Sequence, residues 1–112
     1  MLEDPYFSRL LWYIIAGTRG GVNRAKILKY LIDRPYNSNQ LANLLSIQYK
    51  TVQHHLKVMV SNGMVSKSEG TSYGSVFFLT PLMENHKHIL DKIWEKVRQK
   101  ELRGDTKEEG RY

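Results

Sequence analysis

Hydrophobic residues recur every three or four positions in five stretches of the chain, which predicts five helices. Between the fourth stretch and the fifth, the pattern changes to two β-prone runs separated by a glycine-containing loop, which predicts a hairpin. The predicted helices cover residues 5–16, 22–33, 38–45, 48–62 and 81–102, and the predicted strands cover residues 64–68 and 75–80. The pattern therefore indicates a mostly α protein with one hairpin near its centre.

Capping residues and helix breakers set these boundaries. Asp4 and Thr80 each precede a proline, as expected of an N-cap followed by proline at the first helical position. Asn37 with Gln40 three residues later is a variant of the capping box and predicts the start of the short third helix. Gly63 is the residue expected just past the end of the fourth helix.

The first and last predicted helices have more apolar surface than one small domain can cover. Trp12, Tyr13 and Ile15 make the first helix apolar on nearly every side, and the last helix has a heptad-like seam. We therefore expect a homodimer in which both helices pack against their two-fold mates, with the alternative that the last helix folds back on its own domain. The expected interface residues are Phe7, Leu10, Leu11, Ile14, Met83, His86, Leu90, Ile93, Trp94 and Val97.

Two of the predicted helices meet across a tight turn at Ser46 and are followed by the hairpin, which is the arrangement of a winged helix-turn-helix. Residues 41–47, 51–59 and 62–65 resemble the core of ArsR-type winged-helix transcriptional regulators, and residues 17–24 further resemble archaeal members of that group. The resemblance covers about residues 17–81. Two positions depart from it, because Ser46 stands where the family usually has glycine, and Gln48 stands where serine or threonine commonly caps the next helix.

The length of 112 residues favours one domain. We expect this domain to cover residues 1–103, with an N-terminal helix at 1–17, a winged core at 18–80 and a C-terminal dimerisation helix at 81–103. The tail at 104–112 has no apolar residue until Tyr112 and is expected to be flexible. The fold class is thus a winged helix-turn-helix flanked by N- and C-terminal dimerisation helices.

Charge and composition narrow the kind of partner. The formal net charge is +6, and residues 1–83 carry nine basic and four acidic residues, which favours a polyanionic partner. The most apolar window, residues 6–16, contains Arg9 and is too short to span a membrane. The absence of cysteine excludes disulfides, thiolate zinc sites and cysteine nucleophiles, and cytoplasmic localisation is the default expectation.

The fourth predicted helix has one polar and one apolar face. At 100° per residue, Lys50, Gln53, His54 and Lys57 fall within one arc, opposite the apolar positions that begin with Val52. In this fold such a face enters the major groove, where Gln can pair with adenine and Lys with guanine or phosphate. The expected DNA-binding residues are Gln48, Tyr49, Lys50, Thr51, Gln53, His54 and Lys57 on this helix, Lys67, Ser72 and Tyr73 on the wing, and Arg19 and Arg24 at the start of the second helix. The alternatives are a solvated helix face and an ordinary polar turn.

The histidines give no clear metal site. His55 lies toward the core face of its helix and is expected to be a hydrogen-bonded packing residue. His88 shares a stripe with Glu84, Asp91 and Glu95, but a solvated face is the favoured interpretation, so we expect neither metal nor cofactor.

No paired carboxylates, serine elbow or phosphate-binding glycine motif indicates an enzyme. The sequence therefore predicts a dimeric transcriptional regulator that binds specific double-stranded DNA, and it identifies no small-molecule effector. A winged-helix module for protein interaction and a sequence-tolerant, chromatin-like DNA-binding protein are the alternatives.

Overall fold

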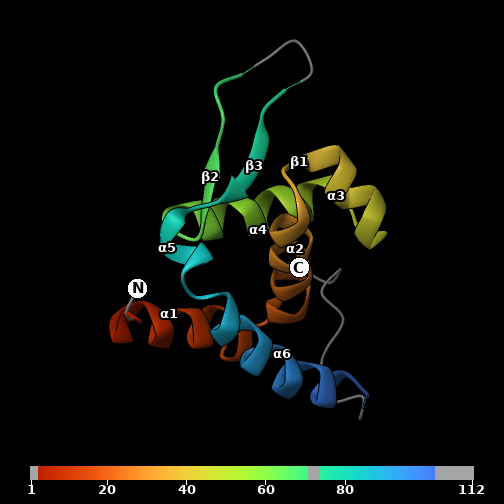
Figure 1. Ribbon diagram of the computed structural model, residues 1–112. Helices are drawn as coiled ribbons and strands as arrows, with labels where there is room; N and C mark the ends of the chain where they lie inside the picture. Colours follow the sequence, from red (N-terminus) through yellow and green to blue (C-terminus); the bar gives the residue numbers. More distant parts are fainter. Residues whose placement is uncertain (1–2, 71–73, 103–112) are drawn as a thin grey trace.

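The computed structural model describes residues 3–70 and 74–102, which form six helices and three short strands (Figure 1). In chain order these are α1 (Pro5–Ala16), α2 (Gly21–Asp33), β1 (Tyr36–Asn37), α3 (Ser38–Leu45), α4 (Tyr49–Ser61), β2 (Val65–Lys67), β3 (Val76–Leu79), α5 (Pro81–Glu84) and α6 (Lys87–Leu102). The predicted fold class, a winged helix-turn-helix with flanking helices, is confirmed. The expected tail at 104–112 lies outside the described residues.

The strands form one antiparallel sheet in the order β1-β3-β2. Phe77 and Leu79 of β3 are buried while the two residues between and before them are exposed, so the predicted hairpin covers the core with one face. Strand β1 was not predicted, because two residues are too few to show alternation. Its Tyr36 pairs with Phe77 and so ties the segment before α3 to the wing.

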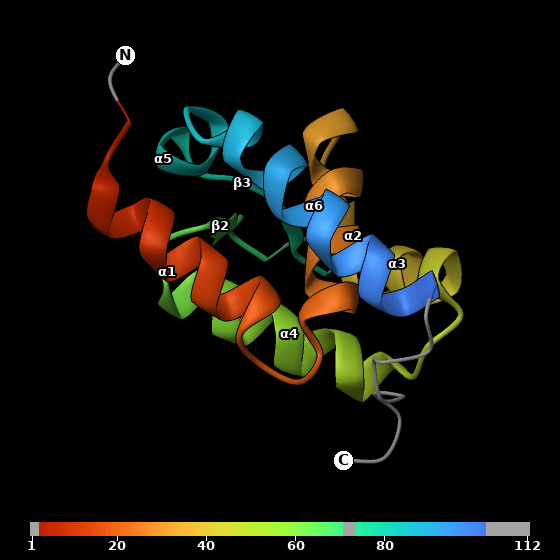
Figure 2. The same cartoon turned by 90° about the horizontal axis from the view of Figure 1, so that it is seen from below.

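Helices α1, α2 and α6 pack against one another; α1 and α6 lie at the end of the molecule away from the wing, whereas α2 rises between them and the sheet and also contacts β3 (Figures 1 and 2). Asp4 caps α1 by accepting from the backbone N–H groups of Tyr6 and Phe7 at 2.9 and 3.3 Å. Within the described ranges, no helix is both long and apolar enough to cross a membrane.

The prediction of one helix from 81 to 102 is wrong, because the helix is interrupted at residues 85 and 86 and forms two separate helices, α5 and α6. Thr80 caps only the short helix α5, by accepting from the N–H of Met83 at 3.1 Å. The break turns His86 into the core, where its Nδ1 donates to the carbonyl of Leu82 at 2.7 Å and its Nε2 accepts from the N–H of Asp4 at 2.9 Å. The imidazole therefore connects the start of α1 to the α5–α6 turn.

The argument that one domain cannot cover the seam of the last helix is also wrong. The residues expected at the dimer interface are mostly at most 6% exposed within a single chain, namely Phe7, Leu11, Ile14, Met83, His86, Leu90, Ile93 and Val97. Helix α6 folds back on α1 and α2 of its own domain, which was the alternative. Leu10 and Trp94 are the two expected interface residues that stay partly exposed.

Candidate nucleic-acid interface

The capping box predicted at the start of α3 is present and fixes the first helix of the helix-turn-helix. The Asn37 side chain accepts from the backbone N–H of Gln40 at 2.8 Å, and the Gln40 side chain accepts from the backbone N–H of Asn37 at 2.8 Å. Two of the N–H groups that a helix start leaves unbonded are satisfied in this way. The position of α3 in the chain is therefore set by local chemistry.

The turn between α3 and α4 keeps its left-handed residue although that residue is serine. Ser46 has φ 56° and ψ 43°, and it is the one non-glycine residue with positive φ in the described part of the chain. The N–H of Ile47 then donates to the carbonyl of Ala42 at 3.2 Å, as in a helix C-terminus closed by glycine. Serine in this left-handed conformation costs about 1 kcal/mol, so the turn has the backbone shape that favours glycine at the expense of some stability.

Helix α4 has the two faces that its sequence predicts. Val52, His55, Leu56 and Met59 are buried. Thr51 is half-buried, and the exposed members of the expected set on and before α4 are Gln48, Tyr49, Lys50, Gln53, His54 and Lys57. Gln48 precedes the helix without a side-chain capping bond, as its departure from serine or threonine implies.

Two of the exposed residues are already paired with each other. The amide nitrogen of Gln53 donates to the hydroxyl of Tyr49 at 2.8 Å, one helical turn away. An amide has two N–H donors and a carbonyl acceptor, so Gln53 retains one donor and its acceptor for another group. The pair restricts the Gln53 side chain, which reduces the entropy lost when it engages a ligand.

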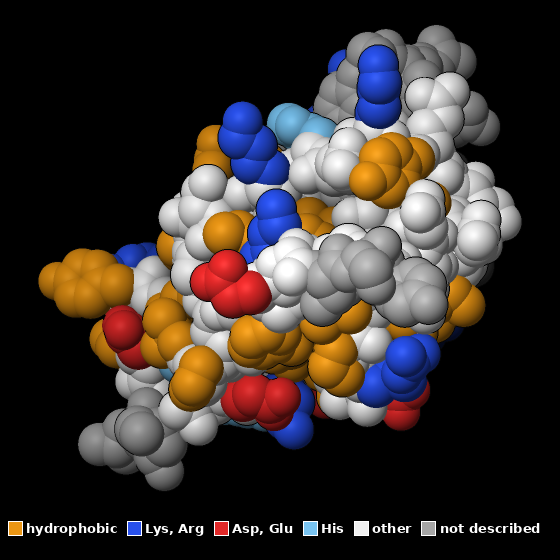
Figure 3. All heavy atoms as spheres, turned by 90° about the horizontal axis from the view of Figure 1, so that it is seen from above, with side chains coloured by type: hydrophobic (Ala, Val, Ile, Leu, Met, Phe, Trp, Pro, Cys, Tyr) orange, Lys and Arg blue, Asp and Glu red, His pale blue; other side chains and the backbone are white. Residues whose placement is uncertain are grey.

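A groove of about 290 Å³ lies between the start of α3, helix α4 and the wing. It brings Lys67 of the wing together with Tyr49 and Gln53 of α4. Asn39 and Ser75 also line it and were missed, because nothing in a linear pattern places the start of α3 beside the wing. Ser72 and Tyr73 of the expected wing set lie outside the described residues. Figure 3 views the molecule from the wing side, where basic side chains and a histidine lie in the upper part, and both acidic and basic side chains lie in the lower part.

Arg24, which was expected to contact DNA at the start of the second helix, is only 4% exposed. Its guanidinium donates to the carbonyls of Ile14 and Arg19 at 3.2 and 2.9 Å and to the hydroxyl of Thr18. It also lies 3.0 Å from Nδ1 of His55 on α4. Arg24 is therefore a buried structural residue and is not available to contact phosphate. Arg19, in contrast, is exposed in the α1–α2 loop.

His55 is a packing residue, as predicted, and its environment keeps it neutral. Burial, the positive charge of Arg24 and that of His54 lower the pKa of His55 from 6.5 to about 3. Because an arginine can only donate, the neutral Nδ1 of His55 must be the acceptor. The buried pair thus joins α2 to the inner face of α4, directly beneath the exposed residues of that helix.

Among the described residues, the acidic side chains expected near His88, namely Glu84, Asp91 and Glu95, do not form a metal site with it. Across residues 3–70 and 74–102, no three His, Cys, Asp or Glu residues are arranged to hold a metal. His88 instead lies 3.2 Å from the carboxylate of Glu3, and this hydrogen bond lowers the pKa of Glu3.

Comparison with known families gives one match. Residues 21–67, from α2 to β2, match the bacterial regulatory protein family described as arsR. No curated protein matches the chain significantly in sequence.

Several solved structures share the fold. The adhesin competence repressor AdcR from Streptococcus pyogenes is 24% identical with a TM-score of 0.54, over 70% of this chain and 64% of that one. A MarR transcriptional regulator from Methanosarcina mazei Go1 is 19% identical with a TM-score of 0.63, over 93% and 79% of the two chains. Diamide-treated YodB from B. subtilis is 15% identical with a TM-score of 0.61, over 88% and 96%.

The chain thus spans a little under two thirds of AdcR, and at these identities the likeness shows the fold alone. The matched segment contains both helices of the turn motif and the first strand of the wing. Residues 21–67 therefore match the helix-turn-helix region of arsR-family regulators, and the chain shares the winged-helix fold of the solved structures.

Proposed function

We propose that this protein is a transcriptional regulator that binds specific double-stranded DNA as a homodimer. The observation that carries the proposal is the exposed polar face of α4 beside the wing groove, within a segment that matches arsR-family regulators. Helix α4 enters the major groove, and the wing follows the adjacent backbone.

The proposed contacts are of two kinds, hydrogen bonds to base edges and contacts to phosphates. Gln53, held by Tyr49, pairs with adenine through its remaining donor and its carbonyl. Lys50 and His54 lie on the same exposed face and contact neighbouring base edges. Lys57 and the wing residue Lys67 contact phosphates, which contributes affinity without sequence information.

The homodimer uses the outer face of α1 in place of the seam that is buried in one chain. Tyr6 and Tyr13 are 78% and 60% exposed, and with the half-buried Leu10 they form one stripe of α1. Aromatic residues on an exposed helix face are typical of subunit contacts. Two-fold symmetry then predicts a pseudo-palindromic site with half-sites about one helical turn, or a multiple, apart.

The first test is binding of the purified protein to a pool of random duplexes across a salt series, with sequencing of the retained DNA. Enrichment of an inverted repeat is the expected result. Retention without enrichment would favour a chromatin-like protein, and no retention would favour a module that binds protein.

Single variants then test the assignment of the α4 face. Gln53→Ala should cost about 1–3 kcal/mol at the selected site and relax specificity at one position. Lys57→Ala should weaken all sequences alike and lower the salt slope by about one. Lys92→Ala is the matched control, because Lys92 is an exposed lysine of α6 and should change neither quantity. The reverse pattern for Gln53 and Lys57 would show that the face is assigned wrongly.

The dimer is tested by sedimentation of the wild-type protein and of Tyr13→Glu. A charge on the α1 stripe should shift the protein towards monomer, because it would be buried without a partner. Phe78→Glu, on an exposed face of β3, is the control and should leave the mass unchanged. A wild-type protein that is monomeric at every concentration would contradict the proposal.

A further inference from the structure

The hydrogen bond between Tyr49 and Gln53 points to a role for Tyr49 that differs from a direct contact with DNA. Tyr49 is the first residue of α4, and Gln53 follows it by four residues, so both side chains lie on one side of the helix. The amide nitrogen of Gln53 donates to the Tyr49 hydroxyl at 2.8 Å. The hydroxyl is therefore already engaged within the protein.

The two partners differ in how freely they can move. A tyrosine side chain has two rotatable bonds and a rigid ring, whereas a glutamine side chain loses much more rotamer freedom when it is ordered. Tyr49 is 44% exposed, and it lines the groove beside the wing together with Asn39 of α3 and Phe77 of β3, so other elements limit where its ring can lie. The tyrosine is thus the more fixed partner, and the glutamine is the one that is positioned.

The bonded orientation of Gln53 still allows it to bind a base. With one N–H donated to Tyr49, the amide keeps its second N–H and its carbonyl oxygen. Adenine presents one acceptor and one donor in the major groove, so it can bind these two groups while the bond to Tyr49 stays intact. A glutamine without this restraint would lose its rotamer freedom only at the moment of binding, which weakens the complex.

We propose that Tyr49 is a positioning residue that sets the sequence preference at one base pair, because its hydroxyl holds the Gln53 amide in the orientation that binds the base. Tyr49 acts through Gln53 and not by a contact of its own with DNA. This inference rests on the proposed function and identifies which side chain determines specificity at that position. Water competes for both groups of an exposed hydrogen bond, so the expected effect on the preference is about three- to tenfold.

The test is a double-mutant cycle on the DNA site that the wild-type protein selects from random duplexes. Binding is measured to this site and to duplexes changed at one base pair, and the pair recognised by Gln53 is the one at which Gln53→Ala loses its preference. Tyr49→Phe removes only the hydroxyl. It should lower the preference at that base pair about three- to tenfold and leave the other positions within about twofold. In the Gln53→Ala background the same change should have less than about a twofold effect, because no amide is left to position.

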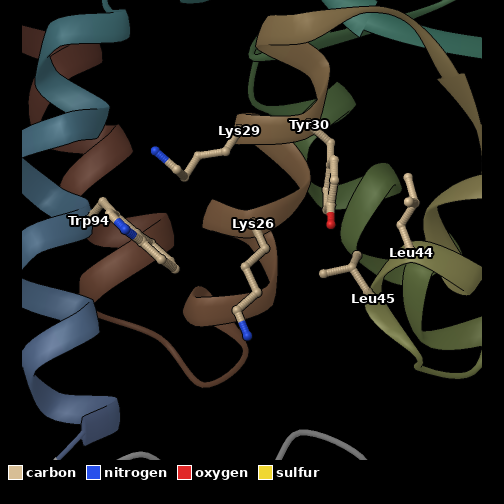
Figure 4. Close-up of a pocket in the computed structure, with 6 residues that line it drawn as sticks. All are labelled: Lys26, Lys29, Tyr30, Leu44, Leu45 and Trp94. Carbon is tan, nitrogen blue, oxygen red and sulfur yellow. The ribbon is translucent and has the colours of Figure 1, made fainter.

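Tyr30→Phe is the matched control, because it also removes one tyrosine hydroxyl. Tyr30 lies on α2 and lines a separate hollow with residues of α3 and α6 (Figure 4). This hollow shares no residue with the groove beside the wing. Tyr30→Phe should therefore leave the preference at every base pair within about twofold.

A second measurement follows the restraint in the free protein. The side-chain amide of Gln53 has its own signals in nitrogen-15 NMR spectra, and their relaxation gives an order parameter for the amide. This order parameter should fall in Tyr49→Phe and stay unchanged in Tyr30→Phe. Equal values in the wild-type protein and in Tyr49→Phe would overturn the proposal.

The binding data can overturn it in several distinct ways. An unchanged or increased preference at the Gln53 base pair in Tyr49→Phe, or the absence of any base pair at which Gln53→Ala loses its preference, would show that Tyr49 does not act through Gln53. An equal loss at every base pair would indicate a merely structural role, and a full effect in the Gln53→Ala background would mean that Tyr49 contacts DNA itself. If the wild-type protein selects no sequence, the proposed function fails and this inference fails with it, whereas a selected site that Tyr49→Phe binds with unchanged preference refutes this inference alone.

Discussion

The neutral His55 predicts a loss of stability in mild acid. In the folded protein burial and the Arg24 charge lower the pKa of His55 to about 3, whereas an unfolded histidine titrates near 6.5. A group whose pKa is depressed by folding binds fewer protons in the native state, so its contribution is present above pH 6.5 and is lost as pH falls towards 3.

The magnitude follows from the same two values. At pH 5 the unfolded chain is protonated at this site and the folded chain is not, over about 1.5 pH units, which corresponds to about 2 kcal/mol at 1.36 kcal/mol per unit. This is a large part of a typical unfolding free energy of about 5–15 kcal/mol. At pH 7.5 both states are neutral at His55 and the contribution is intact.

The assay is urea unfolding followed by circular dichroism at steps between pH 7.5 and pH 5. Wild-type protein and His54→Gln should lose stability with a similar slope, because His54 is exposed. His55→Gln starts from a lower stability but should lose about 2 kcal/mol less over the same range, since glutamine does not titrate. An equal slope in His55→Gln, or a His55 proton resonance that titrates above pH 5, would refute the reasoning.

Other variants test the backbone and the caps. Ser46→Gly should raise the unfolding free energy by about 0.5–1 kcal/mol, because glycine adopts the left-handed turn without strain; a loss would contradict that. Gly21→Ala should lower it by about 3 kcal/mol or more, since a Cβ there would lie 1.5 Å from the carbonyl oxygen of Ile15. Gly70→Ala meets open space, and its effect should stay within about 0.5 kcal/mol; equal losses at both glycines would be inconsistent with the packing. Thr80→Ala removes the cap of α5 and should cost about 1–2 kcal/mol, measured in the same urea titrations.

Local signals in the sequence predicted the helix starts well. Asp4, Asn37 and Thr80 each accept the backbone N–H that their positions imply. Such bonds form between residues two or three apart, so neighbours in the sequence decide them. The two faces of α4 were predicted for a similar reason, because helical periodicity fixes which residues share a side.

The buried hydrogen bond between Arg24 and His55 was not predicted, although helical periodicity held a signal for it. Arg24 precedes the buried Leu28 and Leu31 by four and seven residues, so it lies on their stripe. The general tendency of arginine to be exposed outweighed that spacing. What changes the outcome is the set of acceptors around it, including His55 thirty-one residues away, and such a meeting is visible only in three dimensions.

The buried face of α6 was also only partly predictable from the sequence. Periodicity indicates that a helix face is buried, but it does not say what buries it. Leu90 and Ile93 of α6 are buried where that helix packs against the chain's own α1 and α2, and the helical segment is interrupted at residues 85 and 86. Tyr6 and Tyr13 of α1 remain exposed in the single chain, which is why the proposed homodimer uses the outer face of α1.

The Arg24–His55 pair also bears on how α4 is held for its proposed role. Helix α4, whose exposed face is proposed to contact DNA, is held on its buried side by the Arg24–His55 hydrogen bond, which requires His55 to be neutral. Protonation would place two positive charges 3.0 Å apart in the core, so the folded protein keeps His55 neutral and the pair intact at pH 5. The wild-type protein and His55→Gln should therefore show the same change in DNA affinity between pH 7.5 and pH 5, when each is compared with its own value at pH 7.5. A larger fall in the wild-type protein would mean that His55 becomes protonated while the protein is folded.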